Sequence, residues 1–195
     1  MELIQNTPDL SAYLAADDVI DHDHPRVRET AARLAAKAAD SYAYAQLAFE
    51  FVRDTIPHSQ DSGDLRVTWR ASDVLGQGTG ICYAKAHALA ALLRAEDIPT
   101  ALCYQRLADD DGHVVHGLVA LRFNGAWHRQ DPRGNKPGVD ARFSLEGERL
   151  AWIPDPQSNE VDYPVLYAEP HPTVLSVLRA APDRPSLWKT LPSAL

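Results

Sequence analysis

Residues 78–107 read GTGICYAKAHALAALLRAEDIPTALCYQRL, and this stretch decides the fold because it joins a helix to a strand. Its part from residue 81 to 97 is rich in Ala and Leu and places Leu89, Leu92 and Leu93 on one stripe, which predicts a helix with Cys82 in its first turn. The part TALCYQRLA, residues 100–108, predicts the first strand of a sheet. Small Ala86 and Ala90 on this helix are positions where a sheet can pack closely.

Two further strands follow along the chain. HVVHGLVALRF, residues 113–123, comes after an Asp/Gly turn, and AWHRQD, residues 126–131, comes after Asn124-Gly125. Asn-Gly between two apolar runs is the strongest short-range hairpin signal. The sequence therefore predicts an antiparallel meander of three strands.

The register of this hairpin relates Asp131 to His116. A two-residue turn pairs Phe123 with Ala126, so Asp131 lies opposite Leu118. Leu118 is two residues from His116 and shares its face of the sheet, because side chains alternate along a strand. We expect Asp131 and His116 to be diagonal neighbours.

The remaining segments are predicted from helix-forming composition and from the positions of Pro and Gly. They are two helices within residues 26–55, with Ser41 as N-cap of the second and Pro57 after its end; a glycine-punctuated loop over residues 58–80; a strand at 149–154; and a short helix at 173–181 after Pro172. This order is an α+β arrangement. With 195 residues we expect one domain, residues 1–195, whose core is about 45–135 and carries the N-terminal helices and the C-terminal tail.

Composition limits the classes of partner. The formal net charge is −8, which repels nucleic acid and anionic membrane surfaces. The N-terminal segment MELIQNTPDLSAYL lacks the basic start and apolar run of a signal peptide, which favours a cytoplasmic protein. Two cysteines are too few for a disulfide framework, so at least one free thiol needs an explanation. The oligomeric state stays open.

Cys82 has the surroundings of a nucleophile. Unpaired N–H groups and the positive end of the dipole at a helix N-terminus favour a thiolate, and the same N–H groups can hold an oxyanion. A nucleophilic cysteine also needs a base and a group that orients the base. His116 and Asp131 are the candidates for these two roles, which predicts a covalent acyl-enzyme mechanism without a metal or organic cofactor.

The run GTGICYAKAHALAALLRAEDIPTALCYQRL, followed by HGLVAL and WHRQDPRG, resembles the core of the transglutaminase-like superfamily of papain-like thiol enzymes. The resemblance covers residues 45–135 and is greatest to the compact bacterial members. It implies a papain-like core, with the nucleophile helix packed on an antiparallel sheet. It also implies a Cys at a helix start, a His on one strand and an Asp at the end of the next, at Cys82, His116 and Asp131. Animal tissue transglutaminases have a tryptophan after the nucleophile and large flanking domains with calcium sites, whereas this sequence has Tyr83 and 195 residues. The resemblance therefore does not imply calcium dependence or protein cross-linking.

Five residues near Cys82 in the sequence are candidates for binding the substrate or the oxyanion. Gln77 carries an amide donor, Gly80 allows close approach to the thiol, and His58, Gln60 and Trp69 lie in the polar loop before it. A plain surface loop is the competing interpretation for His58 and Gln60. The predicted substrate is a peptide or protein.

Other interpretations remain beside the thiol enzyme, a hydrolase or acyl transferase acting on amide or peptide bonds. One is a peptide-binding module without activity on the same fold. The other is a metallohydrolase that uses His113, His116 and Cys103, which strand alternation disfavours because His113 and His116 point to opposite faces. Cys103 lies within an apolar strand and is predicted to be a core residue. The Asp21–His24 cluster is predicted to be a polar loop before a helix that starts at Pro25.

Overall fold

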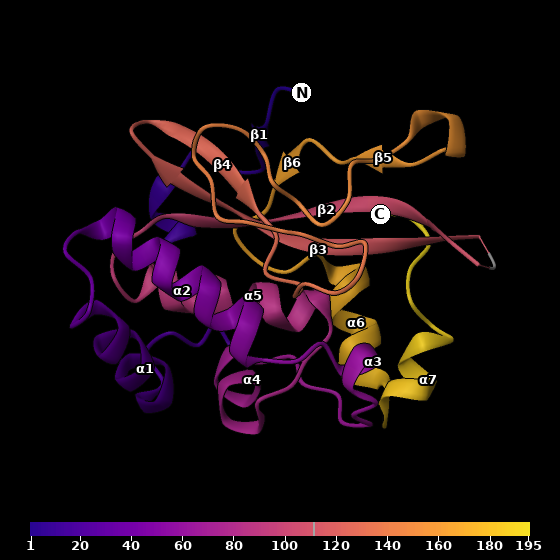
Figure 1. Ribbon diagram of the computed structural model, residues 1–195, viewed down its shortest axis with the longest axis horizontal. Helices are drawn as coiled ribbons and strands as arrows, with labels where there is room; N and C mark the ends of the chain where they lie inside the picture. The colour runs from indigo at the N-terminus through magenta and orange to yellow at the C-terminus, as the bar shows by residue number, and fades with distance from the viewer. Residues whose placement is uncertain (111) are drawn as a thin grey trace.

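The computed structural model describes residues 1–110 and 112–195, and it shows a layer of helices packed on one face of a sheet (Figure 1). The helices are α1 (Pro25–Ala35), α2 (Ser41–Thr55), α3 (Ser59–Ser62), α4 (Ala71–Gln77), α5 (Cys82–Arg94), α6 (Pro172–Ala180) and α7 (Arg184–Trp188), with short 3-10 turns η1 (Leu10–Tyr13) and η2 (Pro156–Ser158). The strands are β1 (Ile4–Gln5), β2 (Thr100–Asp109), β3 (Gly112–Phe123), β4 (Ala126–Gln130), β5 (Val161–Asp162) and β6 (Val165–Leu166). The α+β class predicted from the sequence is confirmed.

The main sheet has the strand order β4-β3-β2-β5, and its neighbouring strands are antiparallel. Asn124 and Gly125 have φ angles of 50° and 81°, the positive values of a type I′ turn. Phe123 pairs with Ala126, so the predicted hairpin register is confirmed. The turn predicted between β2 and β3 includes Asp111, which lies outside the described residues.

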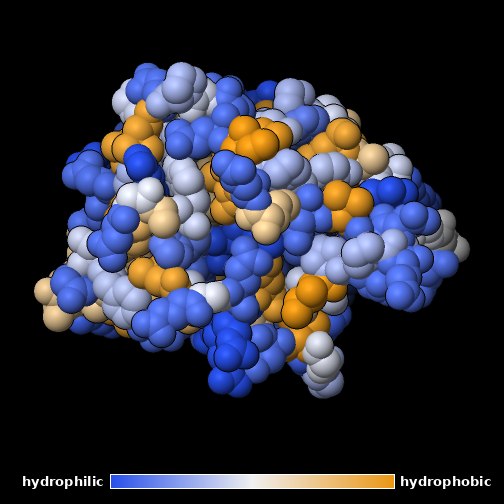
Figure 2. Space-filling model, turned by 90° about the horizontal axis from the view of Figure 1, so that it is seen from above, coloured by the Kyte–Doolittle hydropathy of each residue, from blue (hydrophilic) through white to orange (hydrophobic). Residues whose placement is uncertain are grey.

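The two faces of the sheet carry separate apolar clusters. Val115 and Val119 of β3 belong to the cluster shared with the helices. Leu118 and Ala120 belong to the cluster on the opposite face, where Tyr13 covers them. Viewed from above, the surface over that face is mostly hydrophilic with separated hydrophobic patches, so the sheet is covered on both sides (Figure 2).

β4 is much shorter than β3. Within the described part of the chain, β4 pairs with β3 only over residues 119–123, so the edge of β3 next to His116 lacks a strand partner on that side. Other groups bind this edge: the Val115 N–H donates to the Pro192 carbonyl at 2.8 Å, and the Tyr83 hydroxyl donates to the Val115 carbonyl. The end of β4 therefore leaves room for a cavity between α5, β3 and the C-terminal segment.

The structure corrects three sequence predictions. The N-cap of α2 is Asp40 rather than Ser41, because the Asp40 carboxylate accepts the Ala43 N–H at 2.8 Å. Residues 58–80 contain α3 and α4, short helices that tertiary packing stabilises more than intrinsic propensity does. Residues 149–154 are irregular, and the additional strand is β5, which pairs with Gln105 and Arg106 of β2. The short helix after Pro172 is confirmed, and it begins at that proline.

No helix in the described ranges is both long and apolar enough to cross a membrane.

Candidate active site

Cys82 is the first residue of α5. The N-cap residue, Ile81, has an apolar side chain that accepts no capping hydrogen bond, so the N–H groups of the first turn are left without a side-chain cap. Gly80 precedes them, and a Cβ on Gly80 would lie 2.9 Å from the Ala84 Cβ. Glycine is therefore required for the chain to turn tightly into α5, which leaves the thiol at an uncapped helix end.

Tyr83 holds the first turn of α5 against β3. Its hydroxyl donates to the Val115 carbonyl, and its ring lies so close to the strand that a Cβ on Gly117 would approach Tyr83 Cδ1 to 2.6 Å. Gly117 thus permits a close approach between helix and strand. Tyr83, the neighbour of Cys82, thus contacts Val115 and Gly117, the two residues that flank His116. These contacts fix the position of Cys82 relative to His116.

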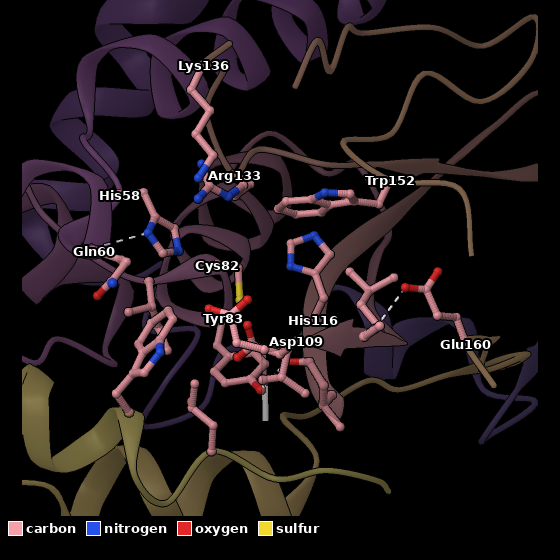
Figure 3. A pocket seen from close by; sticks show the side chains of 18 residues that line it. His58, Gln60, Cys82, Tyr83, Asp109, His116, Arg133, Lys136, Trp152 and Glu160 are labelled. Atoms are coloured by element: carbon pink, nitrogen blue, oxygen red, sulfur yellow. Dashed lines mark hydrogen bonds between the residues drawn. The ribbon is translucent and has the colours of Figure 1, made fainter. Parts of the chain in front are cut away.

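His116 and Asp131 form a buried pair. His116 Nε2 lies 2.8 Å from Asp131 Oδ2, and the two residues are 4% and 0% exposed. The diagonal contact expected from the hairpin register is therefore present. Because Asp131 occupies Nε2, the other ring nitrogen, Nδ1, is the one available to the Cys82 thiol (Figure 3).

The pKa of each member of this pair is displaced. Burial favours the neutral His116 ring, but the Asp131 carboxylate and the neighbouring Cys82 side chain, through charge and hydrogen bonding, outweigh burial and raise the pKa of His116 to about 10. Burial opposes ionisation of Asp131 as well, yet the His116 charge and the backbone N–H groups of Ala151 and Arg133 lower its pKa. Asp131 is thus ionised and His116 protonated at neutral pH.

Trp152 and Arg133 support the pair, and the sequence did not reveal either role. The Trp152 ring meets the His116 ring edge-on, with centroids 4.9 Å apart, and the Arg133 guanidinium lies 5.3 Å from the centre of the same indole. The Ala151 N–H donates to Asp131 Oδ2 at 3.1 Å. Residues 151 and 152 lie in the irregular segment that was predicted to be a strand, where no periodicity indicates which side chains point inward. A sequence feature that could have indicated the role of Arg133 is its position two residues after Asp131.

His58 lies on the other side of Cys82 (Figure 3). Its Nδ1 accepts the Gln60 N–H at 3.3 Å as the N-cap of α3, so its Nε2 carries the ring proton. Burial and the Arg133 charge lower the pKa of His58 to about 3, which keeps the ring neutral. The Ser59 N–H donates to the Gly80 carbonyl at 3.1 Å and holds this segment beside the start of α5. His58 thus offers a neutral N–H donor next to Cys82.

These side chains line a cavity of about 360 Å³. It holds Cys82 and His116 together with the cations Arg133 and Lys136, and its walls include Trp152 and His58. Its other walls come from β2, β3, the segment before β5 and the C-terminal segment, through Asp109, Asp110, Val114, Glu160, Trp188 and Leu191.

Of the five residues predicted to bind the substrate or oxyanion, His58 and Gln60 line this cavity and three do not. Gln60 accepts a hydrogen bond from Arg184 through its Oε1 atom. Gln77 is exposed at the end of α4, and Gly80 is buried before α5, outside the cavity lining. The Trp69 ring lies between the guanidinium groups of Arg70 and Arg179, each 4.8 Å from its centre.

The other polar clusters singled out in the sequence have structural partners. His113 Nδ1 faces Arg106 at 3.1 Å, and its Nε2 faces the Ser158 carbonyl at 2.8 Å. Asp21 accepts the Ser72 N–H, and His24 is the N-cap of α1. Among the described residues, no three His, Cys, Asp or Glu side chains gather closely enough to hold a metal ion.

Cys103 is completely buried in the apolar cluster on the sheet face away from the helices, which confirms the prediction that it is a core residue. Burial raises the pKa of its thiol.

Comparison with known proteins places the chain in a family. Residues 28–132 match the model of the transglutaminase-like superfamily. Among solved structures, a candidate cysteine protease from Cytophaga hutchinsonii is similar, with 19% identity, a TM-score of 0.56, and coverage of 65% of this chain and 43% of that one. The periplasmic domain of TgpA from Pseudomonas aeruginosa gives 20% identity and a TM-score of 0.47 over 65% of this chain and 48% of that one. The chain thus spans less than half the length of these structures. No curated protein matches the sequence.

Proposed function

The chain belongs to the transglutaminase-like superfamily, and from this membership and the geometry of the cavity we propose that it is a thiol-dependent hydrolase or acyl transferase. Its substrate would be an amide or peptide bond in a peptide or protein. The reaction would proceed through a covalent acyl-enzyme on Cys82. The observation that carries the proposal is that Cys82, at the uncapped start of α5, and His116, bonded to the buried Asp131, line one cavity.

The first step is attack of Cys82 Sγ on the carbonyl carbon. The C–S bond forms while the carbonyl electron pair moves onto oxygen. The Cys82 backbone N–H and the His58 Nε2–H are the two donors proposed to hold this oxyanion, because the first belongs to the first residue of α5 and the second lies beside it. A neutral His58 ring suits this role, since its N–H remains a donor without depending on pH across the neutral range.

The second step is departure of the amine. His116 donates its Nδ1 proton to the leaving nitrogen as the C–N bond breaks, and Asp131 holds the ring through Nε2. Water or a second amine then attacks the thioester carbon and gives a proton to His116. The C–S bond breaks, Cys82 leaves as a thiolate, and the acid or the new amide is released. Trp152 covers the ring and restricts its rotation.

Thiol labelling tests the proposal. Iodoacetamide should alkylate Cys82 much faster than Cys103, because Cys82 lines the cavity and Cys103 is completely buried. Peptide mapping by mass spectrometry measures both rates in the folded protein. Slow, equal labelling of the two thiols would refute the proposal.

Substrate profiling then separates the two reactions. A peptide library, incubated with and without a primary amine, would show either hydrolysis or transfer, and intact mass would detect the acyl group on Cys82. The matched variants are Cys82→Ser and Cys103→Ser. Loss of turnover in Cys82→Ser alone supports the enzyme, whereas a peptide-binding module without activity would show binding but no turnover in the unmodified protein.

A further inference from the structure

One end of the cavity carries more positive than negative charge. Arg133 and Lys136 both line the cavity there, and both bind the same carboxylate, Asp61. The pKa of Asp61 is about 2: burial raises it, but the hydrogen bonds and charge of Arg133 and the hydrogen bond of Lys136 outweigh burial. Two cations thus share one ionised carboxylate, which leaves one positive charge in excess.

Arg133 alone donates hydrogen bonds to both carboxylate oxygens of Asp61. Its two terminal nitrogens lie 2.5 Å and 3.0 Å from the two Asp61 oxygens, a bidentate contact, and the Arg133 residue is only 5% exposed. Lys136 makes a single contact of 3.2 Å with one oxygen, and its side chain is 42% exposed. Lys136 is therefore the cation that can turn to another anion while Asp61 stays paired with Arg133.

The backbone holds Lys136 at this place. The Lys136 N–H and carbonyl both bond to Val139, at 3.2 Å and 2.8 Å, around the turn Lys136-Pro137-Gly138-Val139. Gly138 has a φ of 83°, which suits the third position of a type II turn after proline. The lysine thus projects from a closed turn.

The opposite end of the cavity carries negatively charged side chains. Asp109, Asp110 and Glu160 line it, and Figure 3 places Asp109 and Glu160 below and to the right of Cys82, with Lys136 and Arg133 above. The chain as a whole has a net charge of −8, so the positive end of the cavity differs in sign from the charge of the whole molecule. An anionic group entering the cavity is repelled at one end and attracted at the other.

We propose that the substrate carries an anionic group, such as a carboxylate, that lies against Lys136 while its reactive carbonyl lies at Cys82. The polarity of the cavity then fixes the direction in which the substrate lies. Lys136 is the residue that sets this specificity. The inference rests on the proposed function, because it takes Cys82 as the reacting atom.

Chloroacetyl dipeptide amides test the charge preference without a known substrate. Cys82 Sγ forms a bond with the probe methylene carbon as the C–Cl bond breaks and chloride leaves. Chloroacetyl-Gly-Glu-amide and chloroacetyl-Gly-Gln-amide have nearly the same shape and differ in one charge. The measurement is the ratio of their rate constants at Cys82, by mass spectrometry at low salt.

We expect the glutamate probe to react about fivefold faster, which corresponds to about 1 kcal/mol. The ratio should fall to about one in Lys136→Met and below one in Lys136→Glu. It should stay high in Lys37→Met, which removes the same charge from an exposed position after α1. High salt should also reduce the ratio, through screening.

Two results would overturn the inference in distinguishable ways. Labelling of Cys82 at equal rates by both probes, or an unchanged ratio in Lys136→Met, refutes the role of Lys136 and leaves the thiol chemistry standing. Failure of every probe to label Cys82 refutes the proposed function and this inference with it.

Discussion

The two walls beside Cys82 each carry a buried histidine, and the two rings have opposite protonation. The pKa of His116 is raised to about 10, and that of His58 is lowered to about 3. Burial disfavours the charged ring in both. The difference arises because His116 bonds to the ionised Asp131, whereas His58 bonds to a backbone N–H and faces Arg133. The partner, rather than the extent of burial, decides whether a buried histidine holds a proton.

This contrast assigns different proposed tasks to the two walls. A ring that holds its proton beside a thiol can deliver that proton to a leaving group. A ring that stays neutral can donate an N–H to an oxyanion without changing charge. Substitutions that exchange or remove these properties test the assignment.

The largest effect is expected from Asp131→Asn. The amide keeps the shape but removes the charge that raises the pKa of His116, so the pKa should fall toward that of His58. By analogy with other triads, kcat/KM should fall by about four orders of magnitude. Enzyme kinetics and NMR titration of His116 measure both quantities. The control is Asp140→Asn, since Asp140 is exposed and pairs with Arg142 outside the cavity. Activity within tenfold of the original would contradict the assignment.

The next largest effect is expected from His58→Phe, which removes the proposed oxyanion donor. Loss of one such donor lowers kcat by about two to three orders of magnitude. KM should change little, because the interaction strengthens in the transition state. His58→Gln restores an N–H donor and should recover part of the rate, which a purely structural role for the ring does not predict. His128→Phe, on the hairpin outside the cavity, is the matched control.

A smaller effect is expected from Trp152→Ala, which removes the edge-on contact with His116. Aromatic contacts of this kind contribute about 1 kcal/mol, so kcat should fall about five- to tenfold. Trp127→Ala removes a tryptophan that packs on Tyr13 instead, and it should affect thermal stability more than kcat. Steady-state kinetics and thermal unfolding of the two variants separate these outcomes. Equal losses of kcat would place Trp152 in a structural role only.

The smallest effect is expected in the pH dependence of stability. The pKa of His116 rises on folding, so its stabilising contribution is full below pH 6.5 and is lost as pH rises from 6.5 through about 10. The pKa of His58 falls on folding, so its contribution is lost as pH falls from 6.5 through about 3. Thermal unfolding across this range measures both. Asp131→Asn should weaken the alkaline loss and His58→Phe the acid loss, with Tm shifts of about 2–4 °C per kcal/mol. If Tm depended on pH in the same way in both variants, the opposite protonation of His116 and His58 would be contradicted.

Local sequence patterns predicted the wall of the cavity that carries Cys82 and His116. Cys82 at a helix start, the Asn124-Gly125 turn and the diagonal contact between Asp131 and His116 all follow from residues near one another in the chain, because helix starts and two-residue turns have fixed geometries. The catalytic roles of these residues stay a prediction. Trp152 was missed, since residues 149–154 have no regular structure and no periodicity.

By itself, the sequence determined the α+β class, the helix that begins at Cys82 and the hairpin register that brings Asp131 to His116. These depend on backbone geometry over a few residues. The sequence named His58 and Gln60 as binding candidates with a plain surface loop as the alternative, and only the tertiary structure put them beside the thiol. It alone brought in Arg133 and Lys136 from after β4, Trp152 from the irregular segment and Trp188 from α7. Their positions and charges depend on contacts between distant segments. The protonation of the two histidines therefore became predictable only when the chain was folded.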